Sequence, residues 1–257
     1  MEIVSIGQIC ALLLFTVIVI LEIYFYGQKE ARHLRRIEGV EKIDEAIRRA
    51  TEMGRPVLSS TGIDALYSTC APAIIANLDI IGYLAKETAK LGTKLILAIG
   101  PSDVLPLATE IYREGCIAAG VPEAFKEDNV RFLTDQQWPY TAAMFGIMER
   151  EKPAANIFVG RYHAEALHFG VMGRRTGAIT IAGNTALGMA SFFVVSCDYT
   201  LLGEEVYAAG AYLSKEKARI NAISSQDVIK WIGVALIVIG AIASTFGSGI
   251  ITDILKL

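Results

Sequence analysis

The most reactive stretch of the sequence is Arg161-Tyr162-His163-Ala164-Glu165, which brings together a cation, an aromatic ring, an imidazole and a carboxylate. An imidazole beside a carboxylate is a pairing that general acid–base catalysis uses. The same residue types also occur where a helix starts, because a carboxylate there accepts hydrogen bonds from free backbone N–H groups. His163 and Glu165 therefore have two interpretations, an acid–base pair or the beginning of a helix.

Hydroxyl groups gather in a second stretch, SSTGIDALYSTCAP at residues 59–72, which is long for a loop that follows a strand. Ser60, Thr61 and Thr69 are its candidates for contact with a ligand, through their side chains or through backbone donors of the loop. The alternative is a packed turn in which the same hydroxyls cap the backbone.

Single polar residues follow other apolar runs of the chain, at Ser102, Asn184 and Asp198. Cys197 ends one of these runs, and it is interpreted either as a nucleophile or as a core side chain. The sequence identifies no catalytic residue, but an enzyme would have to use His163, Glu165 or Cys197. The complete set of ligand-binding candidates is Ser60, Thr61, Thr69, Ser102, Arg161, His163, Glu165, Asn184 and Asp198.

Several well-known chemical signatures are absent from the sequence. There is no GxGxxG after the first apolar run, no GxxxxGK(S/T), no GxSxG and no HExxH, so the common nucleotide-binding, hydrolase and zinc-protease motifs are missing. The histidines provide no convincing metal set, because His163 and His168 fall on different faces of a helix. We expect neither a metal nor a cofactor. The net charge of −3 also gives no basis for binding nucleic acid.

Short apolar runs alternate with helical stretches along the middle of the chain. The expected strands are 56–60, 94–100, 130–134, 156–160, 178–183 and 192–197, and the expected helices are 73–91, 103–119, 135–151, 163–173, 185–190 and 203–217. This alternation predicts an α/β domain with a doubly wound, mostly parallel sheet of about six strands. Strand exits of such a sheet share its carboxyl edge, where open α/β folds bind ligands. We expect the candidates to meet there.

Two apolar segments near the ends of the chain, residues 3–26 and 229–251, are long enough to cross a hydrocarbon core of about 30 Å. Hydrophobic residues make up 53% of the chain, which is high for a protein without such segments. Basic residues flank each segment on the side of the central domain: Lys29, Arg32, Arg35 and Arg36 after the first, and Lys215, Lys217 and Arg219 before the second. This pattern predicts a two-pass protein of the plasma membrane, with both termini outside and the α/β domain cytoplasmic.

These segments divide the sequence into five parts. We expect an N-terminal transmembrane helix at 1–27, an amphipathic connector helix at 28–54, the cytoplasmic α/β domain at 55–214, a basic connector at 215–228, and a C-terminal transmembrane helix with a short tail at 229–257. In the last part, Gly233, Gly240 and Gly247 recur every seven residues and, with Ser244, predict a face small enough for close helix packing. Glycine is also common in membrane helices generally, so both interpretations stay open.

Several stretches of the sequence match a known family. They are GRPVLSSTG, DNVRFLT, REKPAANIFVG, GAITIAG and CDYTLLGEEVYAAGAYLS, followed by the hydrophobic C-terminal segment. Together they resemble an uncharacterised prokaryotic membrane-protein family, a domain of unknown function found in methanogenic archaea and some bacteria, with a Rossmann-like domain and terminal transmembrane helices. The resemblance runs from about residue 54 to the end of the chain. It implies this architecture but no activity, and no catalytic residue can be carried over from it.

Three functions are compatible with these features. We favour a membrane-anchored α/β scaffold or accessory subunit that self-associates into a homo-oligomer, because the chain has two anchors, small-residue helix faces and no catalytic motif. One alternative is a membrane-tethered sensor that binds a small anionic or nucleotide-like ligand at the carboxyl edge of the sheet. The other is an enzyme of unknown reaction. The expected partners are the lipid bilayer, further copies of the chain and, as a further option, another membrane complex.

Overall fold

The computed structural model describes residues 16–17, 20, 36–214, 220, 230–231, 233–235 and 237–238. The chain separates into two units, Arg35–Ser214 and a second that combines residues 1–34 and 215–257. The first unit is the α/β domain, and it contains every candidate residue of the carboxyl edge.

The predicted membrane segments fall almost entirely outside the described residues. Among the residues that are described, no helix is both long enough and apolar enough to span a bilayer. Of the predicted helix-packing residues, Gly233 is described, whereas Gly240, Ser244 and Gly247 lie outside the described ranges. The basic connector at 215–228 also lies outside them, apart from Ile220.

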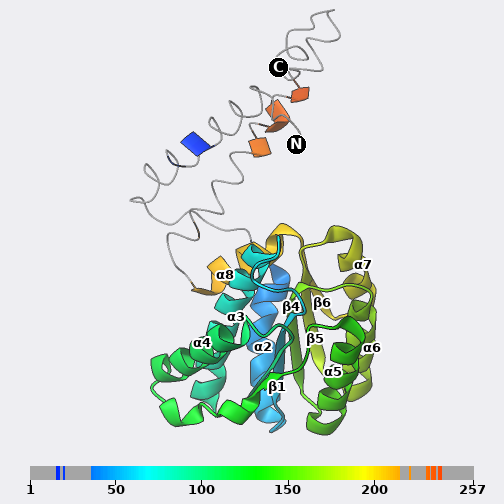
Figure 1. The fold of residues 1–257 in the computed structure, drawn as a ribbon. Coiled ribbons are helices and arrows are strands. Elements are labelled where there is room, and N and C mark those ends of the chain that lie inside the picture. The colour runs from blue at the N-terminus through cyan, green and yellow to red at the C-terminus, as the bar shows by residue number, and fades with distance from the viewer. Residues whose placement is uncertain are drawn as a thin grey trace, which may run out of the picture. The chain divides into compact units, whose positions relative to one another are not determined.

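A six-stranded parallel sheet forms the centre of the domain (Figure 1). Its strands are β1 (Val57–Gly62), β2 (Leu95–Ile99), β3 (Val130–Phe132), β4 (Ala155–Arg161), β5 (Ile179–Asn184) and β6 (Tyr199–Leu202), in the spatial order β3-β2-β1-β4-β5-β6. Every neighbouring pair is parallel. The direction of winding reverses between β1 and β4, as in Rossmann-like sheets.

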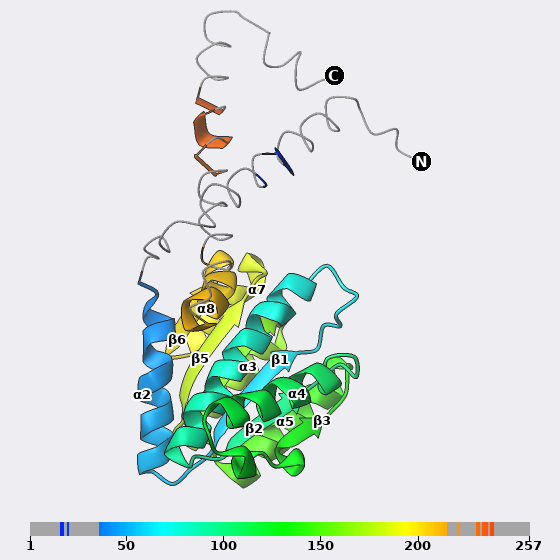
Figure 2. The same ribbon diagram turned by 90° about the vertical axis from the view of Figure 1, so that its left-hand side faces the viewer.

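Helices cover both faces of this sheet (Figures 1 and 2). One face carries α2 (Glu38–Glu52), α3 (Ala71–Leu91), α4 (Leu105–Ala118) and α8 (Glu204–Ser214), and the other carries α5 (Gln137–Glu151), α6 (Glu165–Thr176) and α7 (Leu187–Ser196). Two short 3-10 segments, η1 (Pro122–Ala124) and η2 (Glu127–Asn129), join α4 to β3. The domain therefore has the three layers of a doubly wound fold.

The strands are apolar along both sides because both sides are covered. In β2, Leu97 and Ile99 belong to the core under α3, whereas Ile96 and Ala98 belong to the core under α5. All four side chains are fully buried or nearly so. Side chains of a strand alternate between its two faces, so two cores demand an uninterrupted apolar run.

The first five predicted strands are confirmed as β1 to β5, and the helices predicted at 73–91, 103–119, 135–151 and 163–173 are confirmed as α3 to α6. The sixth predicted strand, 192–197, is wrong, because these residues mostly belong to α7. Ala190, Phe193 and Cys197 are buried, whereas Val194 and Val195 are exposed. Burial at intervals of three and four residues is typical of a helix that packs against the domain on one side. The last strand is β6, a few residues further on.

Helix α2 is part of the α/β domain rather than a connector. The predicted amphipathic helix is present, but its apolar side chains, among them Val40, Ile43 and Ile47, are buried in the core on the sheet. A Cβ on Gly39 would lie 3.0 Å from the side chain of Leu201 in β6. The α/β domain therefore begins near residue 35 instead of residue 55. Helix α2 packs on β4, β5 and β6 and covers that half of the sheet.

Candidate functional site

The carboxyl ends of β1 and β4 lie side by side, with Gly62 paired to Arg161. This is where the strand order reverses, which is the usual place for a ligand in an open α/β sheet. Here the two backbones touch instead. A Cβ on Gly160 would lie 2.3 Å from the carbonyl oxygen of Thr61, and a Cβ on Gly62 would lie 2.6 Å from that of Arg161. Only glycine fits these positions, so the two strand exits are packed directly against each other.

Ser60 is the centre of a buried hydrogen-bond network just below these glycines. Its hydroxyl is bonded to the hydroxyl of Tyr140 from α5. Its carbonyl oxygen accepts hydrogen bonds from the Tyr162 hydroxyl at 3.0 Å and from Asn77 Nδ2 of α3 at 2.9 Å. All four residues are fully buried, and this burial raises the pKa of both tyrosines above its usual range. The network joins β1 to helices on both faces of the sheet.

Glu165 is a fully buried carboxylate at the start of α6. Its Oε1 accepts a 2.9 Å hydrogen bond from the backbone N–H of His163, and its Oε2 accepts one from the side-chain amide of Gln137. The His163 imidazole takes no part in either bond. This geometry supports the helix-start interpretation of these two residues, since the carboxylate satisfies a backbone donor at the helix entrance.

Arg161 reaches from the end of β4 to the loop that follows β1. One guanidinium nitrogen donates to Cys70 Sγ at 3.0 Å, and Nε lies 3.6 Å from Asp64 Oδ2. The contact with Cys70, followed by the attraction of Asp64, raises the pKa of Arg161 above its ordinary value. Arg161 thus holds the loop of residues 59–72 against β4.

The remaining candidates at this edge differ in exposure. Asn184 is fully buried; its Nδ2 donates to the Tyr162 carbonyl at 2.8 Å, and its Oδ1 accepts from the backbone N–H of Ala186 at 3.1 Å. Thr61 is also buried, and its hydroxyl has no hydrogen-bond partner among the described residues. Ser102 and Thr69 are exposed. The Asn184 side chain therefore caps the turn that follows β5, whereas the side chains of Ser102 and Thr69 are accessible to solvent.

Asp198 and Cys197 lie at the amino edge of the sheet, not at the carboxyl edge where the sequence predicted them. Asp198 precedes β6, and its Oδ2 accepts a 2.7 Å hydrogen bond from the backbone N–H of Thr180, near the start of β5. Cys197 is buried at the end of α7, and burial raises the pKa of its thiol to about 12. A protonated thiol is a poor nucleophile, so Cys197 fits the core interpretation.

Three residues were not singled out from the sequence: Asn77 and Tyr140 of the buried network, and Gln137, the partner of Glu165. They lie on helices α3 and α5, whereas attention to strand ends singled out the loops. Asn77 donates to the carbonyl oxygens of both Ser60 and Val159. The one available signal was an amide inside the apolar stretch AIIANLDII, because a buried amide needs partners.

The chemistry open to this edge is limited, because its polar groups mostly bond to one another. Within residues 36–214 and the other described positions, no group of three or more His, Cys, Asp and Glu side chains is arranged to hold a metal ion. Besides the Thr61 hydroxyl, three buried acceptor atoms near the edge have no hydrogen-bond partner among the described residues: Asn77 Oδ1, Asp64 Oδ2 and Asp103 Oδ1. Asp64 Oδ2 nevertheless lies within ion-pair distance of Arg161.

Fold and site together define a Rossmann-like α/β domain whose strand exits are filled by an internal polar network. A family model described as a domain of unknown function, DUF6754, matches residues 2–255, and the chain belongs to this family. The match confirms the expected membership in a family without an assigned function, and it begins well before residue 54. A comparison with curated proteins finds no match.

Proposed function

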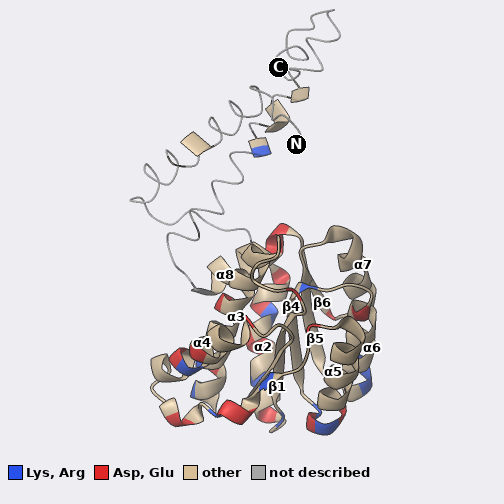
Figure 3. Ribbon diagram, viewed as in Figure 1, with Lys and Arg blue, Asp and Glu red and all other residues tan. Residues whose placement is uncertain are grey.

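We propose that the chain is a membrane-anchored scaffold without catalytic activity, and that its α/β domain self-associates through the outer surface of α7. The observation that carries this proposal is the composition of α7, LGMASFFVVS, which has no charged residue although one side of the helix faces solvent. In Figure 3, α7 is tan along its length. A solvated helix normally places charges on its outer side.

The outer side of α7 is apolar instead. Leu187, Val194 and Val195 are 69%, 53% and 65% exposed. Helix α6, which packs beside α7, adds Val171 at 56%. Arg174 of α6 is also exposed and donates a 3.1 Å hydrogen bond to the carbonyl oxygen of Val195, so a cation borders these apolar side chains. Exposed apolar surface with a polar rim is typical of a protein interface.

A second copy of the same chain is the occupant that we propose for this surface. Soluble domains most often assemble with their own copies, through a patch that is complementary to itself. Anchoring to a bilayer would hold copies in one plane and raise their effective concentration, so a modest apolar patch would be sufficient.

The membrane anchor is the second part of the proposal. It is supported by the apolar segments at residues 3–26 and 229–251 and by their basic flanks, which favour a two-pass topology with the α/β domain in the cytoplasm. An anchored chain would stay in the membrane fraction through an alkaline carbonate wash. Release of the chain into the supernatant would contradict the anchor but not the assembly.

Native mass after gentle extraction tests the assembly. Wild-type protein is expected to run as a homo-oligomer, and Val195→Glu is expected to reduce it to single copies, since a charge on the apolar surface opposes its burial. Ile117→Glu is the matched control, because Ile117 is 58% exposed on α4, on the opposite face of the sheet. Wild-type protein of single-copy mass, or an oligomer that survives Val195→Glu, would overturn the proposal.

The sensor and enzyme alternatives receive less support at the carboxyl edge. Ser60, Asn184 and Glu165 are buried and bonded within the domain. The amino edge of the sheet, in contrast, contains a cavity.

A further inference from the structure

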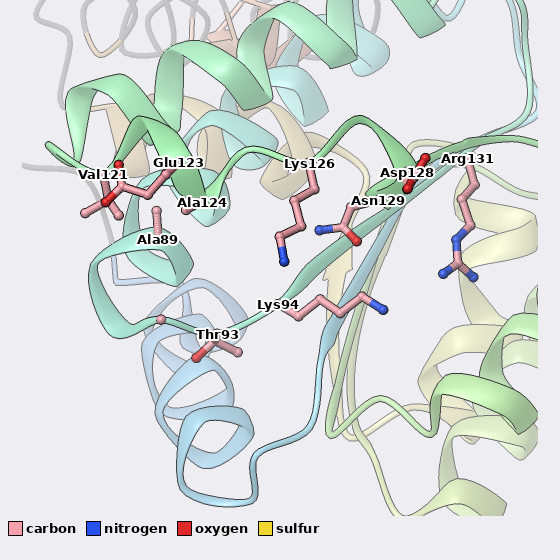
Figure 4. A pocket seen from close by; sticks show the side chains of 11 residues that line it. Ala89, Thr93, Lys94, Val121, Glu123, Ala124, Lys126, Asp128, Asn129 and Arg131 are labelled. Carbon is pink, nitrogen blue, oxygen red and sulfur yellow. The ribbon is translucent and has the colours of Figure 1, made fainter.

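A cavity of about 570 Å³ opens at the amino edge of the sheet, away from the candidates discussed above (Figure 4). It lies between the end of α3, the loop that enters β2, and the 3-10 segments that precede β3. Its volume falls in the range of about 300–1,000 Å³ that small-molecule sites occupy. Ala89, Val121 and Ala124 give it an apolar side.

Three cationic side chains, Lys94, Lys126 and Arg131, line this cavity together with two carboxylates, Glu123 and Asp128. Two of the cations are held by Glu151 of α5, with Lys94 Nζ at 2.9 Å from Oε2 and Arg131 bonded to Oε1. Hydrogen bonds from Arg131 and then Lys94 lower the pKa of Glu151, so this carboxylate stays ionised. The single negative charge of Glu151 balances only one of the two positive charges of Lys94 and Arg131. Lys126 forms no ion pair with any described carboxylate.

The orientation of the side chains concentrates donors at one end of the cavity. In Figure 4, the Lys126 ammonium and the Asn129 amide lie next to each other and point toward Lys94. Glu123 lies at the far end, and Asp128 lies on the side of Asn129 opposite to Lys126. Asn129 is only 6% exposed, and its Nδ2 donates to the Tyr112 hydroxyl at 3.4 Å. The Tyr112 ring packs edge-on against Phe125, with ring centroids 5.2 Å apart. Asn129 is thus held in place beside the Lys126 ammonium.

We infer that this cavity binds a small molecule carrying a phosphate or carboxylate group, with the anion at Lys126, Asn129 and Lys94. Ammonium groups bind phosphate and carboxylate oxygens through charge-assisted hydrogen bonds. The C-terminal end of α3 carries a partial negative charge, which keeps the anion on the Lys126 side of the cavity. The apolar side chains would then contact the rest of the ligand. The site is independent of the proposed self-association, because it lies on other elements.

Titration of the full-length protein in detergent with inorganic pyrophosphate and, separately, with citrate tests this inference at constant ionic strength. Calorimetry gives the affinity, and the melting temperature reports stabilisation by the bound anion. We expect saturable binding of at least one of the two probes, and the stronger one identifies phosphate or carboxylate as the preferred group. Lys126→Gln is expected to weaken this binding about tenfold, because it removes a charge-assisted contact.

Lys86→Gln is the matched control, since it removes the same charge from an exposed position of α3 that does not line the cavity. It is expected to bind the probe as the wild type does. The melting temperature of Lys126→Gln without probe shows that this variant is folded. Absence of binding for both probes, or equal affinity of wild type and Lys126→Gln, would overturn the inference. The native mass is measured on the same samples, so failure of this site is distinguishable from failure of the scaffold.

Discussion

The two edges of the central sheet use their polar residues in different ways. At the carboxyl edge, Ser60, Asn77 and Tyr162 are buried and bonded to one another. At the amino edge, Lys94 and Lys126 line a cavity that opens to solvent. A strand exit rich in hydroxyls is therefore no guide to a binding site when the loops pack on each other, since buried polar groups must first satisfy their own hydrogen bonds.

The largest effect on the stability of the folded domain is expected at alkaline pH. The folded-state pKa values of Tyr140, Tyr162 and Cys197 are raised by burial, that of Cys197 to about 12. Their protonated forms therefore stabilise the folded state fully below the unfolded-state pKa values, about 8.5 for cysteine and about 10 for tyrosine. This stability is lost as pH rises through and above those values, because the unfolded chain then releases protons that the folded chain retains.

The melting temperature is accordingly expected to fall from about pH 9 and steeply above about pH 10. Ultraviolet absorbance of phenolate, followed in the same samples, shows whether the buried tyrosines ionise before or after the protein unfolds. If the absorbance of Tyr140 and Tyr162 changes while the protein is still folded, the carboxyl edge is open to solvent and the contrast between the edges fails. Tyr140→Phe and Tyr162→Phe assign the absorbance to each ring.

Asn77→Ala should have the next largest effect. It removes the donor to the carbonyl oxygens of Ser60 and Val159, which are buried. Loss of these bonds is expected to lower the free energy of unfolding by about 3 kcal/mol. Ser102→Ala, at an exposed position of the same edge, is expected to change it by less than about 0.5 kcal/mol. Thermal unfolding of the two variants side by side measures the difference, and equal stabilities would show that the network is not structural.

The smallest effect on stability is expected for Lys126→Gln at the amino edge. Lys126 is exposed and forms no ion pair with a described residue, so its replacement should change the free energy of unfolding by less than about 0.5 kcal/mol. Thermal unfolding without added anion provides the measurement. A loss of stability comparable to that of Asn77→Ala would mean that Lys126 at the amino edge is also structural. The distinction between the two edges would then disappear.

Much of the fold was predictable because its signals are local. Five apolar runs became β1 to β5, since a strand buried on both sides must be apolar throughout. The run at 192–197 carries the same residue types but forms the end of α7. A short apolar run does not distinguish a strand from a buried helix, because the deciding contacts come from other elements. That error also moved Cys197 and Asp198 to the wrong edge.

The candidate site was less predictable than the fold. Glu165 and His163 had two interpretations in the sequence, and the second hydrogen-bond partner of Glu165, Gln137, comes from α5. The cavity at the amino edge gave no sequence signal, because Lys94 belongs to the connection from α3 to β2, whereas Lys126 and Asn129 belong to the connection from α4 to β3. Nothing in their local sequence marks them as a group.

The sequence by itself determined the α/β class and the parallel winding, because periodicity and composition are properties of short stretches of chain. The resemblance of several stretches to a family of unknown function likewise needed no structure. Tertiary structure alone decided which polar residues are used inside the domain and which face solvent. Ser60 bonds to Tyr140, 80 residues further along the chain, and the strand exits close through backbone contact at Gly62 and Gly160. Such burial depends on long-range packing, which no local pattern records.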